Sequence, residues 1–209
     1  MGRNSWHRVP DQSRSASDTP GPADSTAASS LKRRRKRRRP VAIALVILVI
    51  AGSAATARLF IWPDRGMPAR VSAIVMMNGT GDRLDTALNL AWQHRAPFVV
   101  IARGSAYFGH GSVCAPRIPH VQVICFDPSP ATTRGEAEFA GRLARRYHWQ
   151  SVVLVTTTPQ ASRARLRVER CFTGPVYVMT ASLPLSSWPY ELAYEWGATV
   201  KALIVSRSC

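Results

Sequence analysis

The sequence predicts an α/β domain with a parallel sheet, joined to one apolar helix. Two observations predict the domain: after residue 70, short Val- and Ile-rich segments of strand length alternate with amphipathic segments of ten or more residues. Such strands pair in parallel through right-handed crossovers, with helices on both faces of the sheet. The third observation is an uncharged apolar run at residues 41–57, beside a block of basic residues. We therefore expect a Rossmann-like three-layer domain preceded by one transmembrane helix.

The positive charge is divided unevenly along the 209 residues. Residues 1–40 contain eleven Lys or Arg and three Asp, whereas residues 41–209 contain seventeen basic and nine acidic residues. Half of the formal net charge of +16 therefore belongs to a fifth of the chain. This distribution argues against a uniformly basic nucleic-acid-binding domain, and we expect no nucleic-acid partner. The 46% hydrophobic content, concentrated after residue 40, is enough for one medium-sized core.

Residues 1–40 are expected to form a disordered, basic, cytoplasmic tail. Residues 1–30 are rich in Ser, Ala, Pro, Gly and Asp and have almost no aliphatic side chains, so they cannot bury enough surface to fold. Lys32–Arg39 form an uninterrupted basic octet. The positive-inside rule places this octet in the cytoplasm, against anionic lipid. A nuclear-localisation or nucleic-acid patch is the alternative, and the adjoining apolar run weighs against it.

Residues 41–62 are expected to form the transmembrane helix of a single-pass membrane protein. Val41–Ala57 contain no charge, and the apolar stretch continues past Arg58, whose side chain can snorkel to the interface. Trp62 would mark the far interface. The orientation predicts that everything after this residue lies outside the cytoplasm.

A cleavable signal peptide is the rival interpretation of this segment. Ala55-Thr56-Ala57 matches the small-x-small pattern that signal peptidase reads, although the long polar region before it is atypical of signal peptides. We favour the uncleaved anchor. Both interpretations export residues 71–209 behind a linker at residues 63–70.

Within residues 71–209, periodicity predicts five strands and four helices. Strands are expected at Val71–Asn78, Phe98–Ala102, Val121–Phe126, Ser151–Thr156 and Val176–Met179, and helices at Asp82–Gln93, Thr133–Tyr147, Gln160–Arg170 and about Pro189–Ser206. In the last helix, a stripe of Leu192, Trp196, Val200 and Leu203 predicts a face packed on the core. The alternative is that Trp188 and Tyr190, near its start, lie at the membrane surface.

Ligands of such sheets bind at the carboxyl ends of the strands, so the strand-to-helix turns are the places to look for chemistry. The first turn is Asn78-Gly79-Thr80-Gly81-Asp82-Arg83. Its glycines would let the backbone approach an anion, and Arg83 would lie in the following helix. A dinucleotide fingerprint is excluded, because the third glycine would fall at Leu84 and no acidic residue follows at the required distance. A purely structural turn is equally consistent with this segment.

The second turn leads into the helix that begins near Thr133. Thr133 and Glu136 have the spacing of a capping box, in which both side chains would satisfy free amides at the helix start. The functional alternative is that Thr133 orients a ligand and that Glu136 transfers a proton.

The third turn follows the strand that ends at Thr156. Pro159 suits the first helical turn and Thr158 suits the cap. Gln160 and Arg163 are three residues apart and share a helical face, so they could converge on one anionic or amide-bearing ligand. Arg167 and Arg170, further along, are expected to form a solvated face.

The three turns, in this order, resemble the YdcF/SanA/ElyC-like family of envelope-associated α/β proteins. The resemblance covers about Val71–Cys209 and depends on MMNGTGDR, on TTRGEAEFA with Thr133 and Glu136, and on VTTTPQASRAR with Thr156 and Arg163. It implies a role in envelope or peptidoglycan metabolism, and a nucleotide-type ligand has been associated with one branch of the family. Where the family usually has a histidine this chain has Gln160, which cannot titrate near neutral pH. If the family pocket works through that histidine, this chain would bind a ligand without turning it over.

Other chemistry has weaker support in the sequence. His110, in a Gly-flanked loop on the ligand-bearing edge, is the one histidine that we nominate as catalytic, together with Glu136. Serine-hydrolase, zincin and P-loop motifs are absent from the sequence. The acidic residues of the domain are too few and too scattered to predict a metal site, and no cofactor can be named.

The four cysteines have neither CxxC nor zinc-finger spacing. Export would make them disulfide partners, and they permit three pairings that sequence alone does not distinguish. We favour Cys114 with Cys125 and Cys171 with Cys209. The second pair would tie the C-terminus to the domain.

Three functions stay open at this point. The leading hypothesis is an exported domain that binds a small anionic or nucleotide-like envelope metabolite through Asn78, Gly79, Gly81, Arg83, Thr133, Thr156, Gln160 and Arg163, with Glu136 also orienting the ligand. The second is an enzyme of envelope-precursor metabolism that uses Glu136 or His110 for proton transfer. The third is a structural or regulatory membrane protein with an empty pocket and a lipid-binding tail.

Overall fold

The computed structural model describes residues 23–103, 114 and 116–209, with side chains from Pro40 onward. The chain divides into two compact units, Met1–Ile50 and Ala51–Cys209, and each is described by itself. His110 and residues 1–22 lie outside the described residues. The catalytic role that the sequence suggests for His110 therefore stays a prediction.

Helix α1, Ala23–Thr56, contains Pro40 and continues into a short π-helix, η1, Ala57–Ile61. The 22 residues Pro40–Ile61 are long and apolar enough to cross a membrane. The helix begins at Ala23, so its first part lies in the region that the sequence analysis assigned to a disordered tail. Alanine, lysine and arginine are strong helix formers, and this basic segment extends a helix that already exists.

The domain is built on a five-stranded, entirely parallel sheet with strand order β3-β2-β1-β4-β5. The strands are β1 (Ala73–Met76), β2 (Phe98–Ala102), β3 (Gln122–Phe126), β4 (Val152–Thr157) and β5 (Val176–Ala181). The predicted bounds of β2 to β5 differ from these by no more than two residues at either end. Strand β1 is shorter than the predicted Val71–Asn78 by two residues at each end. The strand order reverses between β1 and β4. In an open parallel sheet this reversal leaves a crevice at the carboxyl ends of those two strands.

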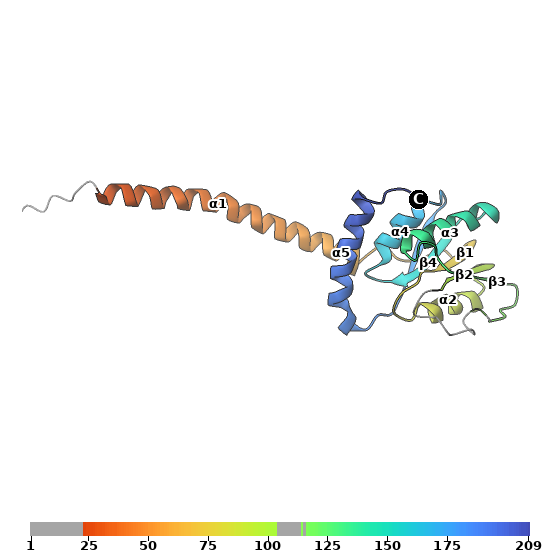
Figure 1. Ribbon diagram of the computed structural model, residues 1–209. Coiled ribbons are helices and arrows are strands. Elements are labelled where there is room, and N and C mark those ends of the chain that lie inside the picture. Colours follow the sequence, from red (N-terminus) through yellow and green to blue (C-terminus); the bar gives the residue numbers. More distant parts are fainter. Residues whose placement is uncertain (1–22, 104–113, 115) are drawn as a thin grey trace, which may run out of the picture. The chain divides into compact units, whose positions relative to one another are not determined.

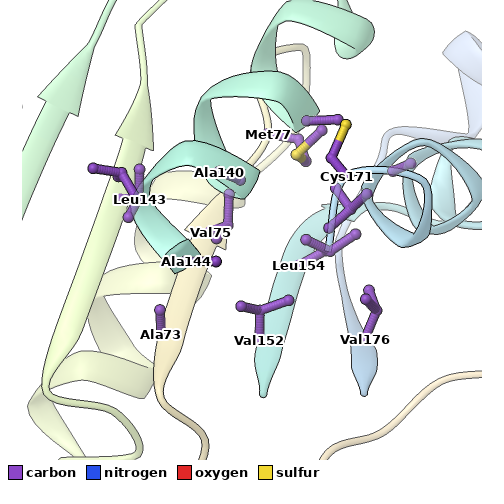
Figure 2. Close-up of a cluster of buried hydrophobic side chains, with 14 of the residues drawn as sticks. Ala73, Val75, Met77, Ala140, Leu143, Ala144, Val152, Leu154, Cys171 and Val176 are labelled. Atoms are coloured by element: carbon purple, nitrogen blue, oxygen red, sulfur yellow. The ribbon is translucent and has the colours of Figure 1, made fainter. Parts of the chain in front are cut away.

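Helices cover both faces of the sheet, which gives three layers (Figure 1). Helix α2, Arg83–Trp92, packs through Ala87, Leu90 and Ala91 on one face. Helices α3, Thr133–Arg146, and α4, Ala161–Glu169, cover the other. Figure 2 shows this second core, in which Ala140 and Ala144 of α3 lie over Val75 and Leu154 of the sheet. The small alanines allow α3 to approach the strands closely. The α/β class and the three layers are as the sequence predicts.

The last helix, α5, Trp188–Ile204, follows a single 3-10 turn, η4, Leu185–Ser187, and packs on α4. Its buried residues are Glu195, Thr199 and Ala202. The predicted core stripe is therefore wrong for Val200 and Leu203, which are 45% and 47% exposed, whereas Leu192 and Trp196 are partly buried. The reason is tertiary: Arg163 of α4 faces this helix and pairs with Glu195, so α5 turns its polar face inward.

The end of the apolar segment docks on the domain. Phe60 of η1 is fully buried and meets the ring of Trp196 on α5 at 5.3 Å between centroids. Trp196 Nε1 donates a hydrogen bond to Thr56 Oγ1 at 3.1 Å, and Ser162 Oγ donates one to the Leu59 carbonyl at 2.6 Å. These last residues of the predicted transmembrane helix thus pack against protein.

The predicted linker at residues 63–70 is also attached to the domain. The Gly66 amide donates a hydrogen bond of 2.8 Å to the Val178 carbonyl, forming an isolated antiparallel bridge on β5. Asp64 pairs with Arg58 at 2.7 Å, and that cation holds the pKa of the Asp64 carboxyl below its usual value. The segment between η1 and the sheet is therefore held by a backbone hydrogen bond to β5 and by an ion pair with Arg58.

Two disulfides close the domain, Cys114–Cys125 and Cys171–Cys209, with Cα atoms 6.0 and 5.0 Å apart. Both pairings agree with those that the sequence analysis favoured. Disulfides persist in oxidising compartments, so they fit an extracytoplasmic domain.

Candidate functional site

A cavity of about 700 Å³ opens at the carboxyl ends of β1 and β4. We call it the edge cavity. Its lining comes from the turn after β1 (Asn78, Gly79, Thr80), from Arg83, from the start of α3 (Pro130, Ala131, Thr132, Thr133, Arg134, Glu136), from α4 (Gln160, Arg163, Arg167) and from the C-terminal part (Tyr190, Glu191, Tyr194, Glu195, Ala198, Lys201, Ser206). The cavity therefore lies where the strand order reverses, which is the expected ligand position in such sheets. Seven of the predicted site residues line it.

Arg83 lies at the base of the edge cavity and is only 2% exposed. Its guanidinium donates hydrogen bonds to the Thr80 carbonyl at 2.7 Å, to the Asn78 carbonyl at 2.7 Å and to Gln160 Oε1 at 2.6 Å. Further bonds reach the Met77 carbonyl and the Thr157 hydroxyl. The predicted anion-binding arginine thus ties the turn after β1 to β4, and its hydrogen-bonding capacity is largely used within the protein.

Glycine is required beside this guanidinium. Gly79 has φ +142°, and a Cβ there would lie 2.6 Å from Arg83 Nη2. Gly81 has φ +89° and packs against the Ser182 carbonyl, which a Cβ would approach to 2.4 Å. Gly81 does not line the cavity, so the structure gives it a packing role, and of the two glycines only Gly79 is part of the cavity lining.

Gln160 connects three elements around the cavity. Its Oε1 accepts from Arg83 and, at 2.9 Å, from the Thr156 hydroxyl, while its Nε2 donates to Thr133 Oγ1 at 3.2 Å. Thr156 is fully buried below it, within this network and outside the cavity lining. Gln160 also occupies the N-cap of α4 without a capping hydrogen bond, so the predicted cap at Thr158 is wrong.

The cap of α3 differs from the predicted capping box. The N-cap residue is Thr132, whose hydroxyl accepts from the Gly135 amide at 3.3 Å. Thr133 Oγ1 instead accepts from Arg163 Nη1 at 2.8 Å, and Glu136 Oε1 accepts from the Asn78 amide at 2.9 Å. Both predicted box residues therefore face the edge cavity, which favours their functional interpretation.

Glu136 is a buried carboxyl with one oxygen that finds no hydrogen-bond partner among the described residues, Oε2. The side chain is 3% exposed. Burial raises the pKa of Glu136 from 4.5 to about 7, against the opposing effects of the Asn78 amide, Arg83 and Arg163. A carboxyl that titrates near neutral pH inside a cavity can hold a proton, donate it in a hydrogen bond, or transfer it. Asn78 Oδ1, on the same wall, also lacks a partner among the described residues.

Arg163 forms the one buried ion pair among the described residues. Its Nε and Nη2 donate to the two carboxylate oxygens of Glu195, each at 2.6 Å, and the two side chains are 8% and 2% exposed. Burial opposes the charge of the guanidinium, but the hydrogen bonds and charge of Glu195 outweigh it and raise the pKa of Arg163. The guanidinium also lies 5.9 Å from the ring centroid of Tyr194. Its charge is thus neutralised within the protein.

The cations that remain for a ligand are ones that the sequence analysis did not choose. Arg167, expected in a solvated face, is 7% exposed and lines the edge cavity beside Arg134 and Lys201. None of the ion pairs formed by the described residues includes Arg167 or Lys201, whereas Arg134 pairs with Glu138. Burial and the charges of Arg170, Arg163 and Arg134 lower the pKa of Arg167. An anion placed here would relieve that repulsion.

One signal for Arg167 was present in the sequence. It follows Arg163 by four residues, so the two share a helical face, and a face that carries one site residue can carry a second. Glu195, Tyr194 and Lys201 gave no such signal, because α5 reaches the cavity only through tertiary packing.

Two exposed aromatic rings line the same cavity. Tyr190 and Tyr194, one turn apart on α5, stack with centroids 6.3 Å apart and an interplanar angle of 17°. Exposed, parallel aromatic rings provide a stacking surface for another planar ring. The cavity therefore combines a cationic part, a titratable carboxyl and an aromatic rim.

Fold and cavity together define the class of protein: a parallel α/β domain with a polar cavity where the strand order of its sheet reverses. The described part of the chain also contains one helix that is long and apolar enough to span a membrane. No family model, curated protein or solved structure matches this chain.

Proposed function

We propose that the domain binds a small anionic ligand, such as a phosphate ester or a nucleotide-like molecule, in the edge cavity. One observation carries the proposal: Arg167 and Glu136 are both buried and line the same cavity. Arg167 donates to the Ser206 carbonyl but has no carboxylate partner among the described residues, and one of the two carboxyl oxygens of Glu136, Oε2, has no hydrogen-bond partner there. A cation and a carboxyl in one cavity fit a ligand that supplies both an anionic oxygen and a hydrogen-bonding group.

The residues have distinct roles in this proposal. Arg167, Arg134 and Lys201 attract the anion, and protonated Glu136 donates a hydrogen bond to it. Arg83, Gln160 and the Arg163–Glu195 pair hold the walls in place. The rings of Tyr190 and Tyr194 would stack on a planar group of the ligand. A volume of about 700 Å³ fits a ligand of nucleotide size.

Sulfate is the sharpest first probe, because it stays a dianion across the neutral range and cannot itself explain a change with pH. We expect sulfate to raise the thermal stability of the full chain in detergent, with an affinity that falls as pH rises through about 7, where Glu136 loses its proton. Glu136→Gln keeps a hydrogen-bond donor and should make the affinity independent of pH. An affinity equally pH-dependent in this variant would remove Glu136 from the site.

Arg167→Gln tests the cationic part of the site. It should abolish the thermal shift with sulfate, pyrophosphate or nucleotides. Arg165→Gln is the matched control, because Arg165 is on the same helix, pairs with Glu169 and is absent from the cavity lining. Equal loss of the shift in both variants would mean that only the general charge of α4 matters, which contradicts the proposal.

An enzyme is the second candidate function, and the same carboxyl favours it. A group with a pKa of about 7 exists in both protonation states at neutral pH, as general acid–base catalysis requires. Gln160 cannot replace it, because an amide does not titrate in this range. Turnover of a phosphate ester that disappears in Glu136→Gln, while sulfate binding persists, would establish this function over simple binding.

We place this activity outside the cytoplasm, on the membrane, with the N-terminus inside. The support is the apolar helix at Pro40–Ile61, the basic octet before it and the two disulfides of the domain. The envelope role that the family resemblance implies is part of this proposal. We expect activity from a reporter enzyme that works only after export when it is fused to the C-terminus. Activity of a fused reporter that works only in the cytoplasm would show that the orientation is the opposite one.

A further inference from the structure

The outward side of α5 carries an apolar strip, which packs on Phe60 at Trp196 and is exposed along the rest of its length. Trp196, Val200, Leu203 and Ile204 recur at spacings of four, three and one, so they share one side of the helix. Val200, Leu203 and Ile204 are 45%, 47% and 64% exposed. The side that faces the domain holds Glu195 and Thr199 instead. This helix therefore buries polar side chains and exposes aliphatic ones.

The strip begins where the domain meets the apolar helix. Trp196 donates to the hydroxyl of Thr56, a residue of the candidate span Pro40–Ile61, and packs on Phe60. These contacts fix α5 beside the last turn of that span. Where that last turn leaves a membrane, these contacts would keep α5 close to the membrane surface.

The charges near the strip fit the same environment. Lys201, which also lines the edge cavity, lies in the last turn of α5, and Arg207 follows the end of this helix. Both are exposed and take part in none of the ion pairs formed by the described residues. Helices that lie in the membrane interface combine an apolar side, buried about 5–10 Å into the headgroup region, with basic residues that attract anionic lipid.

We propose that α5 is an interfacial helix, whose strip of Val200, Leu203 and Ile204 inserts into the headgroup region of the bilayer in which the apolar helix is anchored. A second copy of the chain fits less well. Three partly exposed aliphatic side chains do not supply the ~800 Å² per partner of a standard protein interface. The domain would then be held to the membrane at two places, through the span and through this helix.

Photocrosslinking of the full chain tests the proposal. The photoreactive residue benzoyl-phenylalanine replaces Val200 or Ile204 in protein reconstituted into vesicles of phosphatidylcholine and phosphatidylglycerol. Asp85, exposed on α2 at the opposite face of the sheet, is the matched control position. Retention of both disulfides in each variant, checked by non-reducing mass mapping, verifies the fold.

We expect lipid adducts from both α5 positions and background levels from the Asp85 position. Covalent dimers without lipid adducts would show that a second copy covers the strip. Absence of any adduct would show that α5 faces solvent, and equal lipid labelling at Asp85 would show that the labelling of α5 does not depend on insertion. Each of these three results overturns the proposal, and none of them affects the ligand-binding experiments on the edge cavity.

Discussion

Replacing Glu136 with glutamine tests the electrostatics of the edge cavity directly. The carboxyl is buried, with Oε1 on the Asn78 amide and Oε2 without a partner among the described residues. Glutamine has nearly the same shape and keeps a carbonyl oxygen for the Asn78 amide. The substitution therefore removes the titration while leaving the packing almost unchanged.

The expected size follows from the pKa. Folding raises the pKa of Glu136 from 4.5 to about 7, and each pKa unit is worth about 1.4 kcal/mol. Between these values the folded state binds more protons than the unfolded state, so the free energy of unfolding falls as pH rises. The contribution is fully present below pH 4.5 and is lost above about pH 7. Through this residue the folded chain loses about 3 kcal/mol on going from acid to mildly alkaline solution.

Urea unfolding of the full chain in nonionic detergent measures this effect. Trp149, 5% exposed in the core beneath α3, provides a fluorescence signal. Other titrating groups contribute equally to both proteins, so they cancel in the difference between variant and wild type. We expect Glu136→Gln to gain about 3 kcal/mol relative to wild type between about pH 4 and about pH 8.

A difference that stays constant with pH would refute the reasoning. It would mean that the carboxyl keeps an ordinary pKa, either because water reaches Oε2 or because a nearby cation compensates its burial. The neutral-pH proton donor that both functional proposals use would then be lost as well.

The remaining predictions concern stability. Arg163→Met leaves Glu195 charged, buried and unpaired, so it should lower the free energy of unfolding by about 3–5 kcal/mol, and adding Glu195→Leu should restore most of it in a double-mutant cycle. Gly135→Ala places a Cβ 2.1 Å from a backbone oxygen and should cost about 1–3 kcal/mol, whereas Gly197→Ala, with open space around it, should be neutral or stabilise α5 by up to about 1 kcal/mol in urea unfolding. Opening the C-terminal disulfide by Cys209→Ser, which removes a link across 38 residues, should cost about 4 kcal/mol and lower Tm under non-reducing conditions; an unchanged Tm would contradict this.

Local patterns were sufficient for the elements and for part of the site. Alternation of short apolar runs with amphipathic segments located all five strands and the four helices of the domain within a few residues, because strand and helix periods depend on neighbouring residues alone. The strand-to-helix turns then brought Asn78, Gly79 and Arg83 to the same sheet edge as Gln160 and Arg163.

Local patterns failed wherever a side chain had two possible partners. Thr133 and Glu136 have capping-box spacing, but Thr132 caps α3, and both side chains turn towards the cavity instead. The sequence pattern suggested that Arg163 binds an anionic ligand, but its charge is neutralised by Glu195, which lies 32 residues further along the chain. Such choices depend on which groups packing brings within hydrogen-bonding distance, and sequence spacing carries no information about that.

By itself, the sequence determined a parallel α/β domain behind an apolar helix, and divided the charge of +16 between a basic segment and an arginine-rich domain. The tertiary structure alone decided what those arginines do. In the folded domain Arg83 donates hydrogen bonds to backbone carbonyls. Arg167 lines the cavity and forms no ion pair with a described carboxylate. The tertiary structure also turned the polar side of α5 inward. The physical reason is that hydrogen bonding and burial depend on distances between segments far apart in the chain, whereas periodicity reports only on neighbours.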